Sequence, residues 1–112
     1  MSFTIYPAID LRGGRVVRLV KGDYDAETVY GDDPLAVAVS FAEAGAPWVH
    51  VVDLDAARSG APTNRLSVAA IADALRGVAH LQTGGGVRSI ADVEALAAAG
   101  VARVVMGSAA IA

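Results

Sequence analysis

Short apolar runs alternate with helical patterns along this chain of 112 residues, and the alternation restricts the folds open to it. Each run has the length of a strand, and the stretches between the runs repeat apolar residues every three to four positions. Short strands that alternate with helices predict parallel pairing through right-handed crossovers. The chain is therefore predicted to be an α/β protein with strands over Phe3–Ile9, Trp48–Val52, Val78–Leu81 and Ala102–Met106.

Three helices are expected between these strands, and their ends carry recognisable signals. Asp33-Pro34 supplies an N-cap and a first-turn proline for the first helix. Ser89 and Asp92 have the spacing of a capping box for the third. A glycine follows each helix, at Gly45, Gly77 and Gly100. The apolar faces are Leu35, Ala38, Val39 and Ala42 in the first helix, Val68, Ile71, Ala72 and Leu75 in the second, and Ile90, Val93, Leu96 and Ala97 in the third.

The remaining segments are predicted to be a hairpin and two loops. Gly13-Gly14 favours a turn into a second extended piece over Val16–Val20, paired with the strand before it. Lys21–Asp33 is polar and has no clear period, which predicts a mobile loop. Ala56–Thr63 is predicted to be another loop.

Composition argues against several classes of function. The chain has a net charge of −3 and no basic run, so nucleic acid is not expected as a partner. It has no cysteine, which excludes disulfides and fits a reducing cytoplasm. Met1–Asp10 lacks the pattern of a signal peptide, and no apolar stretch reaches the length of a membrane span. A cytoplasmic protein is therefore expected. Apolar residues make up 54% of the chain, which predicts a surface covered by further protein.

Charged or glycine-rich residues follow the carboxyl end of each predicted strand. They are Asp10, Asp53, Gly84–Arg88 and Gly107-Ser108. In barrels and open α/β sheets alike, ligands bind at this edge. The sequence therefore predicts that the functional site lies there.

The glycine-rich stretch Gln82–Ser89 joins a predicted strand to a capped helix. Glycines let backbone N–H groups approach an anion, and a helix N-terminus adds partial positive charge, so the stretch suits a phosphate. A tight strand-to-helix turn would use the same glycines, and the two interpretations are evenly weighted at this point. The dinucleotide-binding pattern fits less well, because Ser89 stands where its third glycine would fall.

Four strands are half of what a closed (β/α)8 barrel needs, and such barrels typically have about 250 residues. The chain ends where a fourth helix would follow the last strand. Residues 1–112 are therefore interpreted as a single half-barrel of four β/α units, with the last helix missing or incomplete.

Five motifs resemble the start of a family of histidine-biosynthesis enzymes, the phosphoribosylformimino-carboxamide ribotide (ProFAR) isomerases. The resemblance covers essentially the whole chain, and the conjunction of motifs is more specific than any one of them. The motifs are Pro7-Ala8-Ile9-Asp10-Leu11, Gly14-Arg15-Val16-Val17-Arg18-Leu19, Lys21-Gly22, His50-Val51-Val52-Asp53-Leu54-Asp55 and Gly84-Gly85-Gly86-Val87-Arg88-Ser89.

The resemblance implies the N-terminal half of a TIM barrel whose two halves are similar. It makes Asp10 the general base of an Amadori rearrangement, which converts an aminoaldose to an aminoketose, and it takes the acid and a second phosphate site from the C-terminal half. It implies no metal or organic cofactor. The substrate is a phosphorylated ribose compound, and the residues expected to contact it are Arg18, His50, Gly85, Gly86, Arg88, Gly107 and Ser108.

Plainer roles compete with these assignments. Asp10 could cap the turn that follows it, Ser108 could be a simple helix cap, and Arg18 could be a solvated charge. His50 is either a satisfied interior group or a neighbour of the substrate. Asp53 is expected to bond backbone near its strand end, Trp48 to pack, and His80 to lie at the surface.

Three other functions stay open. The cyclase subunit of imidazole-glycerol-phosphate synthase resembles this chain, but Pro7-Ala8-Ile9-Asp10-Leu11 and Arg18 favour the isomerase. A dual-substrate isomerase that also acts on phosphoribosylanthranilate has a similar N-terminal half. Alternatively, the half-barrel is a phosphate-binding module without catalysis that associates with a second copy, because its sheet has two open edges.

Overall fold

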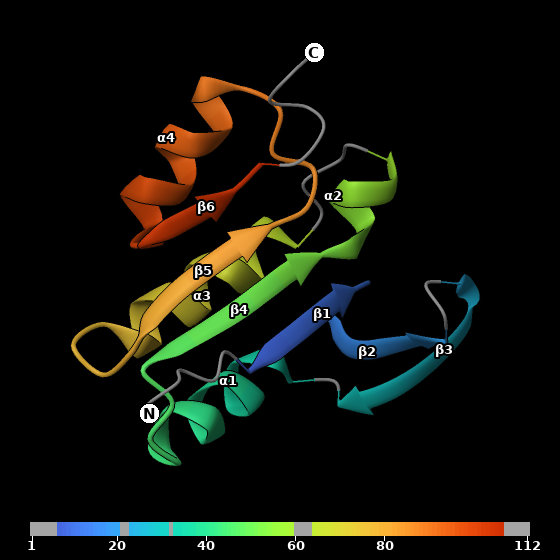
Figure 1. Cartoon of the computed structure of the whole chain (residues 1–112), viewed down its shortest axis with the longest axis horizontal. Coiled ribbons are helices and arrows are strands. Elements are labelled where there is room, and N and C mark those ends of the chain that lie inside the picture. Colours follow the sequence, from blue (N-terminus) through green and yellow to red (C-terminus); the bar gives the residue numbers. More distant parts are fainter. Residues whose placement is uncertain (1–6, 21–22, 32, 60–63, 107–112) are drawn as a thin grey trace, which may run out of the picture.

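The protein is described from a computed structural model, which covers residues 7–20, 23–31, 33–59 and 64–106. Its strands form one six-stranded sheet in the order β3-β2-β1-β4-β5-β6 (Figure 1). The strands are β1 (Ala8–Arg12), β2 (Arg15–Val20), β3 (Asp23–Gly31), β4 (Trp48–Asp53), β5 (His80–Gly84) and β6 (Arg103–Val105). The helices are α1 (Pro34–Glu43), α2 (Leu54–Ser59), α3 (Arg65–Leu75) and α4 (Ile90–Ala99).

The parallel part of the sheet confirms the predicted α/β class. β1 pairs with β4, β4 with β5, and β5 with β6, all in parallel. Each of these pairs is joined through at least one helix, as parallel neighbours require. β2 and β3 extend the sheet beyond β1 as antiparallel strands, and β2 is the predicted hairpin partner of β1.

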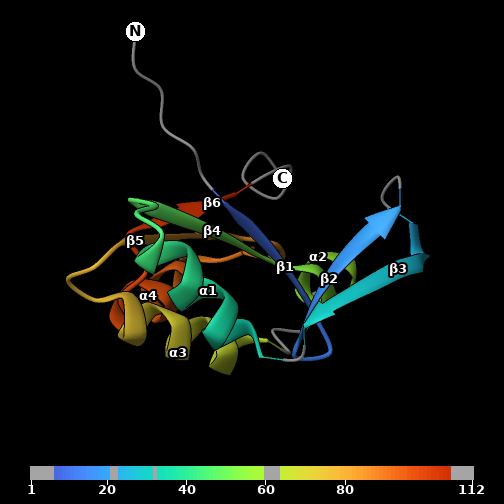
Figure 2. The same ribbon diagram turned by 90° about the horizontal axis from the view of Figure 1, so that it is seen from below.

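The helices α1, α3 and α4 cover one face of the sheet (Figure 2). Because strand residues alternate between faces, the buried set Ile9, Leu11, Val49, Val51 and Leu81 points to this side and forms the core with the helices. The opposite face carries the intervening residues, among them Asp10, His50 and Gln82. No described helix packs over it. None of the described helices has the length and apolar character that a membrane crossing would need.

The second helix packs as predicted, and in the first helix the predicted Ala38 and Ala42 are buried but Leu35 is not. Val68, Ile71, Ala72 and Leu75 of α3 are all buried. In α1 the buried residues are Pro34, Ala38 and Ala42, whereas Leu35 is 38% exposed. Val37 and Phe41 pack at the edge of the core in its place. The prediction for Leu35 was therefore wrong, because the small alanines of α1 form its buried contact.

The apolar face predicted for the third helix is only partly buried. Leu96 is buried in α4 and Val93 packs against the core, but Ala97 is exposed and Ile90 is 76% exposed. The helix lies beside α3 and over the short strand β6 at the end of the sheet (Figure 1). These neighbours cover only the narrow stripe of α4 that contains Val93 and Leu96.

Two segments predicted as loops are regular structure. Asp23–Gly31 is strand β3, held by antiparallel pairing with β2. The segment was predicted to be a loop because its acidic residues hide any apolar alternation, yet charged residues are common on strands at a sheet edge. Leu54–Ser59 is helix α2, which takes up the start of the loop expected over Ala56–Thr63.

Asp53 directly precedes α2 and has the structural role expected for it. Its Oδ1 accepts from the backbone N–H of Ala56 at 3.0 Å, which is a helix-capping bond. The same oxygen accepts from Nδ2 of Asn64 at 2.8 Å, and Oδ2 accepts from the Asn64 backbone N–H at 3.3 Å. Asp53 and Asn64 are 5% and 2% exposed, so a buried carboxylate is paired here with a buried amide.

Asn64 also holds the turn between β1 and β2. Its Oδ1 accepts from the Gly14 N–H at 2.8 Å, and its Nδ2 donates to Asp55 at 2.8 Å. Asp55 in turn accepts from the Gly13 N–H at 2.7 Å. Gly13 and Gly14 have φ of +58° and +76°, a conformation that glycine adopts at little cost. The Asp53–Asn64 network thus ties β1, β2, β4 and α3 together at one edge of the sheet.

Replacing Asn64 tests this network. Asn64→Ala leaves the buried Asp53 carboxylate with fewer donors, so we expect the free energy of unfolding to fall by roughly 1–3 kcal/mol in urea denaturation. Leu66→Ala is the matched control on the same helix. Leu66 is 86% exposed, and its replacement should change stability by less than about 0.5 kcal/mol. Equal effects of the two substitutions would contradict the role of Asn64.

Candidate active site

Asp10, Val52, Gly84 and Val105 lie in register across the carboxyl ends of the four parallel strands. Adjacent strands are about 4.8 Å apart, so Asp10 is roughly 10 Å from the start of the glycine-rich turn. Asp10 and that turn therefore share one edge and border the helix-free face. The two strand-end features that the sequence singled out lie within reach of one small molecule.

Asp10 and His50 shift each other's protonation. Both side chains are half-buried, and they lie on the same face of neighbouring strands. Burial raises the pKa of Asp10 above 3.8, and the attraction of His50 opposes this shift. Burial lowers the pKa of His50 below 6.5, and the charge of Asp10 opposes that. For both groups loss of solvent is the larger cause, which favours a neutral imidazole beside a carboxylate of increased basicity.

A chain of side-chain contacts runs from His50 across the helix-free face. Gln82 Nε2 lies 2.9 Å from His50 Nδ1, and Arg103 Nη1 donates to Gln82 Oε1 at 3.2 Å. The strand register pairs His50 with Gln82 and Gln82 with Arg103, so the three side chains are direct neighbours. The Gln82 and Arg103 side chains were not among the predicted site residues. The sequence feature that could have identified them is a polar residue on the same face of neighbouring, mainly apolar strands.

Arg103, the last residue in this series of contacts, also packs against an aromatic ring. The Arg103 guanidinium carbon lies 4.4 Å from the centre of the Trp48 ring, within the range of a cation–π interaction. The His80 ring is 4.8 Å from the same indole at a tilt of 38°. Trp48 has the packing role expected of it, and His80 is exposed as predicted.

The glycine-rich turn is tightly packed against β4 and α2. Gly85 has φ of +97°, and a Cβ there would lie 2.5 Å from the Asp53 carbonyl oxygen. Gly86 has φ of +69°, and a Cβ there would collide with the Ala56 backbone. Both glycines are therefore required by the turn itself. This requirement supports the turn interpretation and leaves an additional phosphate role compatible with it.

The start of α4 has the capping arrangement that the sequence predicted. Ser89 Oγ accepts from the Asp92 N–H at 3.1 Å, and Asp92 Oδ2 accepts from the Arg88 N–H at 3.0 Å. Asp92 Oδ1 also faces Arg65 at 3.5 Å. The Arg88 backbone bond is the main cause that lowers the pKa of Asp92, so the carboxylate stays ionised at this helix N-terminus. The Arg88 side chain is exposed.

Three of the predicted substrate-contacting residues lie wholly or partly outside the described part of the structure. Arg18 lies in β2, where its backbone pairs with Thr28, but its side chain is outside the described part of the structure. Gly107 and Ser108 also lie outside the described residues. Their roles remain predictions.

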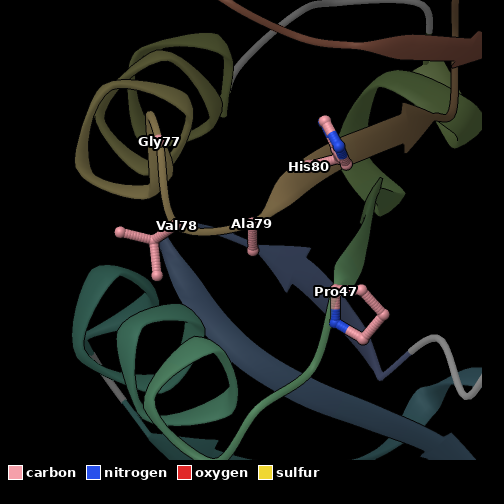
Figure 3. A pocket seen from close by; sticks show the side chains of 5 residues that line it. All are labelled: Pro47, Gly77, Val78, Ala79 and His80. Carbon is pink, nitrogen blue, oxygen red and sulfur yellow. The ribbon is translucent and has the colours of Figure 1, made fainter.

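Two pockets lie at the opposite edge of the sheet, near the amino end of β5. One of about 290 Å³ is lined by Pro47, Gly77, Val78, Ala79 and His80 (Figure 3). The other, of about 230 Å³, adjoins Arg76, Leu81, Gly100 and Ala102. Neither is lined by a carboxylate. Neither pocket therefore includes Asp10 or the glycine-rich turn.

This arrangement defines the class of protein: an α/β half-barrel of the (β/α)8 type, with its polar strand ends gathered at the carboxyl edge of the parallel strands. The model of one family, described as "Histidine biosynthesis protein", matches residues 4–112. The chain belongs to this family, and its architecture is that of the N-terminal half of a TIM barrel.

Curated relatives of this chain are named as isomerases. One from Xanthomonas euvesicatoria pv. vesicatoria is 57% identical over 99% of this chain and 45% of its own length. One from Geobacillus thermodenitrificans is 54% identical over 98% of this chain and 44% of its own length. Both are called 1-(5-phosphoribosyl)-5-((5-phosphoribosylamino)methylideneamino) imidazole-4-carboxamide isomerase. The chain thus spans a little under half the length of these relatives.

Two alanine substitutions separate the steric demand of the turn from its backbone conformation. Gly86→Ala adds a collision to a positive φ, so we expect the free energy of unfolding to fall by about 3 kcal/mol or more. Gly77 has φ of +77° but nothing within 4 Å of an added Cβ, so Gly77→Ala should cost only about 1–2 kcal/mol. Urea denaturation measures both. A cost for Gly86→Ala no larger than that for Gly77→Ala would show that the close approach is absent.

Asp10 predicts a pH dependence of stability. Its pKa is raised on folding, so the folded protein holds the proton more tightly than the unfolded chain, whose carboxyl titrates near 3.8. The resulting stability is present below pH 3.8 and is lost as pH rises through the higher folded-state value. Asp10→Asn should therefore increase the free energy of unfolding at neutral pH and change it little below pH 3.8. Asp73→Asn, in an exposed pair with Arg76, is the control and should give no such gain. A loss of stability at neutral pH would refute the assignment.

Proposed function

We propose that this chain is the N-terminal half of a ProFAR isomerase of histidine biosynthesis, acting on a small phosphoribosyl substrate. The identity to relatives of that name supports the proposal over the cyclase, and it extends over nearly the whole chain. The single observation that carries it in the structure is the position of Asp10. The carboxylate is half-buried at the carboxyl edge of the parallel strands, beside a histidine whose neutral form is favoured.

Asp10 acts as the general base in this proposal. An acid from the C-terminal half protonates the ring oxygen of the aminoaldose, which opens the ribose and leaves an imine. Asp10 then removes the proton from the neighbouring sugar carbon, and the resulting enaminol becomes the aminoketose when a proton returns. A base works best when its pKa approaches the working pH, and burial moves Asp10 in that direction. Proton transfer accounts for the whole rearrangement, so no cofactor is invoked.

The phosphate at this end of the substrate is assigned to the glycine-rich turn. Gly85 and Gly86 carry no side chain that would keep an anion from their backbone N–H groups, and the exposed Arg88 side chain supplies positive charge. The Arg88 N–H already donates to Asp92, so it is not counted among the phosphate donors. Gly107 and Ser108 are proposed to border the same anion, Arg18 to contact the substrate, and His50 to be its neighbour beside Asp10.

The proposed partner is a C-terminal half-barrel that closes over the helix-free face and brings the acid and the second phosphate site. A second copy of this chain is the alternative occupant, because it would present the same helix-free face and the same outer edge of β6, which pairs with no further strand among the described residues. The proposed compartment is the cytoplasm, where amino-acid biosynthesis takes place. A turnover assay with phosphoribosylanthranilate in place of ProFAR tests whether the substrate range is wider.

The role of Asp10 is tested in a completed barrel, made by joining this chain to the C-terminal half of the Xanthomonas euvesicatoria relative. Asp10→Asn keeps the size of the side chain but removes the base, so we expect kcat for ProFAR to fall by about 10²- to 10⁴-fold. Asp73→Asn, an exposed carboxylate on α3, should leave kcat within about twofold. Near-normal turnover by Asp10→Asn would remove Asp10 from the mechanism.

A further inference from the structure

Three polar side chains in contact on the helix-free face determine which nitrogen of the His50 ring carries a proton. Arg103, Gln82 and His50 come from three adjacent strands and touch in sequence. The protonation of His50 depends on which end of the Gln82 amide faces it, since an amide has a donor end and an acceptor end.

Arg103 sets the orientation of that amide. A guanidinium has only donors, so the Gln82 atom that it contacts at 3.2 Å must be the carbonyl oxygen. The guanidinium is itself held over the Trp48 ring at 4.4 Å, which restricts its movement. Turning the amide over would place its NH2 group against the NH groups of Arg103. The observed orientation is therefore the one that the neighbours enforce.

The Gln82 NH2 group consequently faces His50 Nδ1 at 2.9 Å. A donor at this distance requires a lone pair on Nδ1, which the neutral ring has only when its proton is on Nε2. The imidazolium form carries N–H on both nitrogens and would oppose the amide. The titratable groups on the adjacent strands that share this face are Asp10 and Arg12 on β1 and His80 on β5, with Arg103 one strand further.

We propose that Gln82, oriented by Arg103, is a positioning residue that holds His50 in the neutral tautomer with its proton on Nε2. The tautomer rests on the contacts above alone, and its catalytic consequence rests on the proposed function. The Nε2–H group is then the ring's donor toward an oxygen of the substrate. A neutral ring also leaves Asp10 without an adjacent full positive charge, which would weaken it as a base.

Nitrogen-15 NMR of histidine-labelled completed barrel reads the tautomer directly. We expect His50 to show an unprotonated Nδ1 and a protonated Nε2 at neutral pH, with the signals assigned by their loss in His50→Gln. His80 is the internal comparison, because its ring is exposed and has no such amide partner among the described residues. A protonated Nδ1 on His50 in the unsubstituted protein would overturn the proposal.

Gln82→Glu is the matched variant because it keeps the shape and reverses the preference. Its carboxylate accepts from both Arg103 and His50, so Nδ1 should gain a proton and the titration midpoint of His50 should rise by roughly 1–3 pH units. In turnover, kcat should fall at least about tenfold with an altered pH profile, while KM changes little. Arg103→Met should give a mixture of tautomers, because the amide is then free to turn over.

The two levels of the proposal fail separately. An unchanged His50 tautomer and midpoint in Gln82→Glu would overturn the positioning role, whatever the activity. A completed barrel that shows the expected tautomers but does not turn over ProFAR would uphold the positioning role and reject the proposed function. Unchanged His80 signals in Gln82→Glu confirm that the sheet is intact, and if Gln82→Glu does not fold, Arg103→Met supplies the comparison.

Discussion

The buried carboxylate of Asp53 is the constraint on which the carboxyl edge of the sheet depends. A carboxyl group so deep in the protein is costly to bury unless hydrogen-bond donors surround it, and Asn64 and the first turn of α2 supply them. The same asparagine reaches the Gly13-Gly14 turn, so the hairpin after Asp10 is anchored to the connection between β4 and α3. The parallel pairing of β1, β4 and β5 sets the distance from Asp10 to the glycine-rich turn, and this network fixes the hairpin turn beside them.

The one-sided cover of the sheet explains the chemistry of its other face. The helices seal one set of alternate strand residues into an apolar core, while the second set stays half-buried (Figure 2). Half-burial removes enough solvent to shift Asp10 and His50 toward their neutral forms without excluding water entirely. The contacts from Trp48 through Arg103 and Gln82 then give the His50 ring a defined orientation. The face therefore places a half-buried carboxylate beside an imidazole that contacts Gln82.

The glycine-rich turn shows why one motif carries two interpretations. Gly85 and Gly86 are demanded by their close approach to Asp53 and Ala56, which is a packing reason that holds with or without a ligand. Glycines that precede a helix start are also what an anion-binding turn uses. Sequence reasoning could weigh the two only evenly. The geometry establishes the first, and the second remains a proposal that phosphate binding would test.

The sequence by itself determined the parallel α/β class, the caps at Asp33 and Ser89, the buried stripe of α3 and the family, because these depend on local periodicity and short motifs. Tertiary structure decided the rest. Asp23–Gly31 is a strand because β2 offers it an edge, and the apolar faces of α1 and α4 depend on which neighbours reach them. Asn64 and Arg103 act through partners that are between 9 residues (Asn64 to Asp55) and 55 residues (Arg103 to Trp48) away, and no local pattern records such contacts. Pairing of this kind is created only when the strands take up their register.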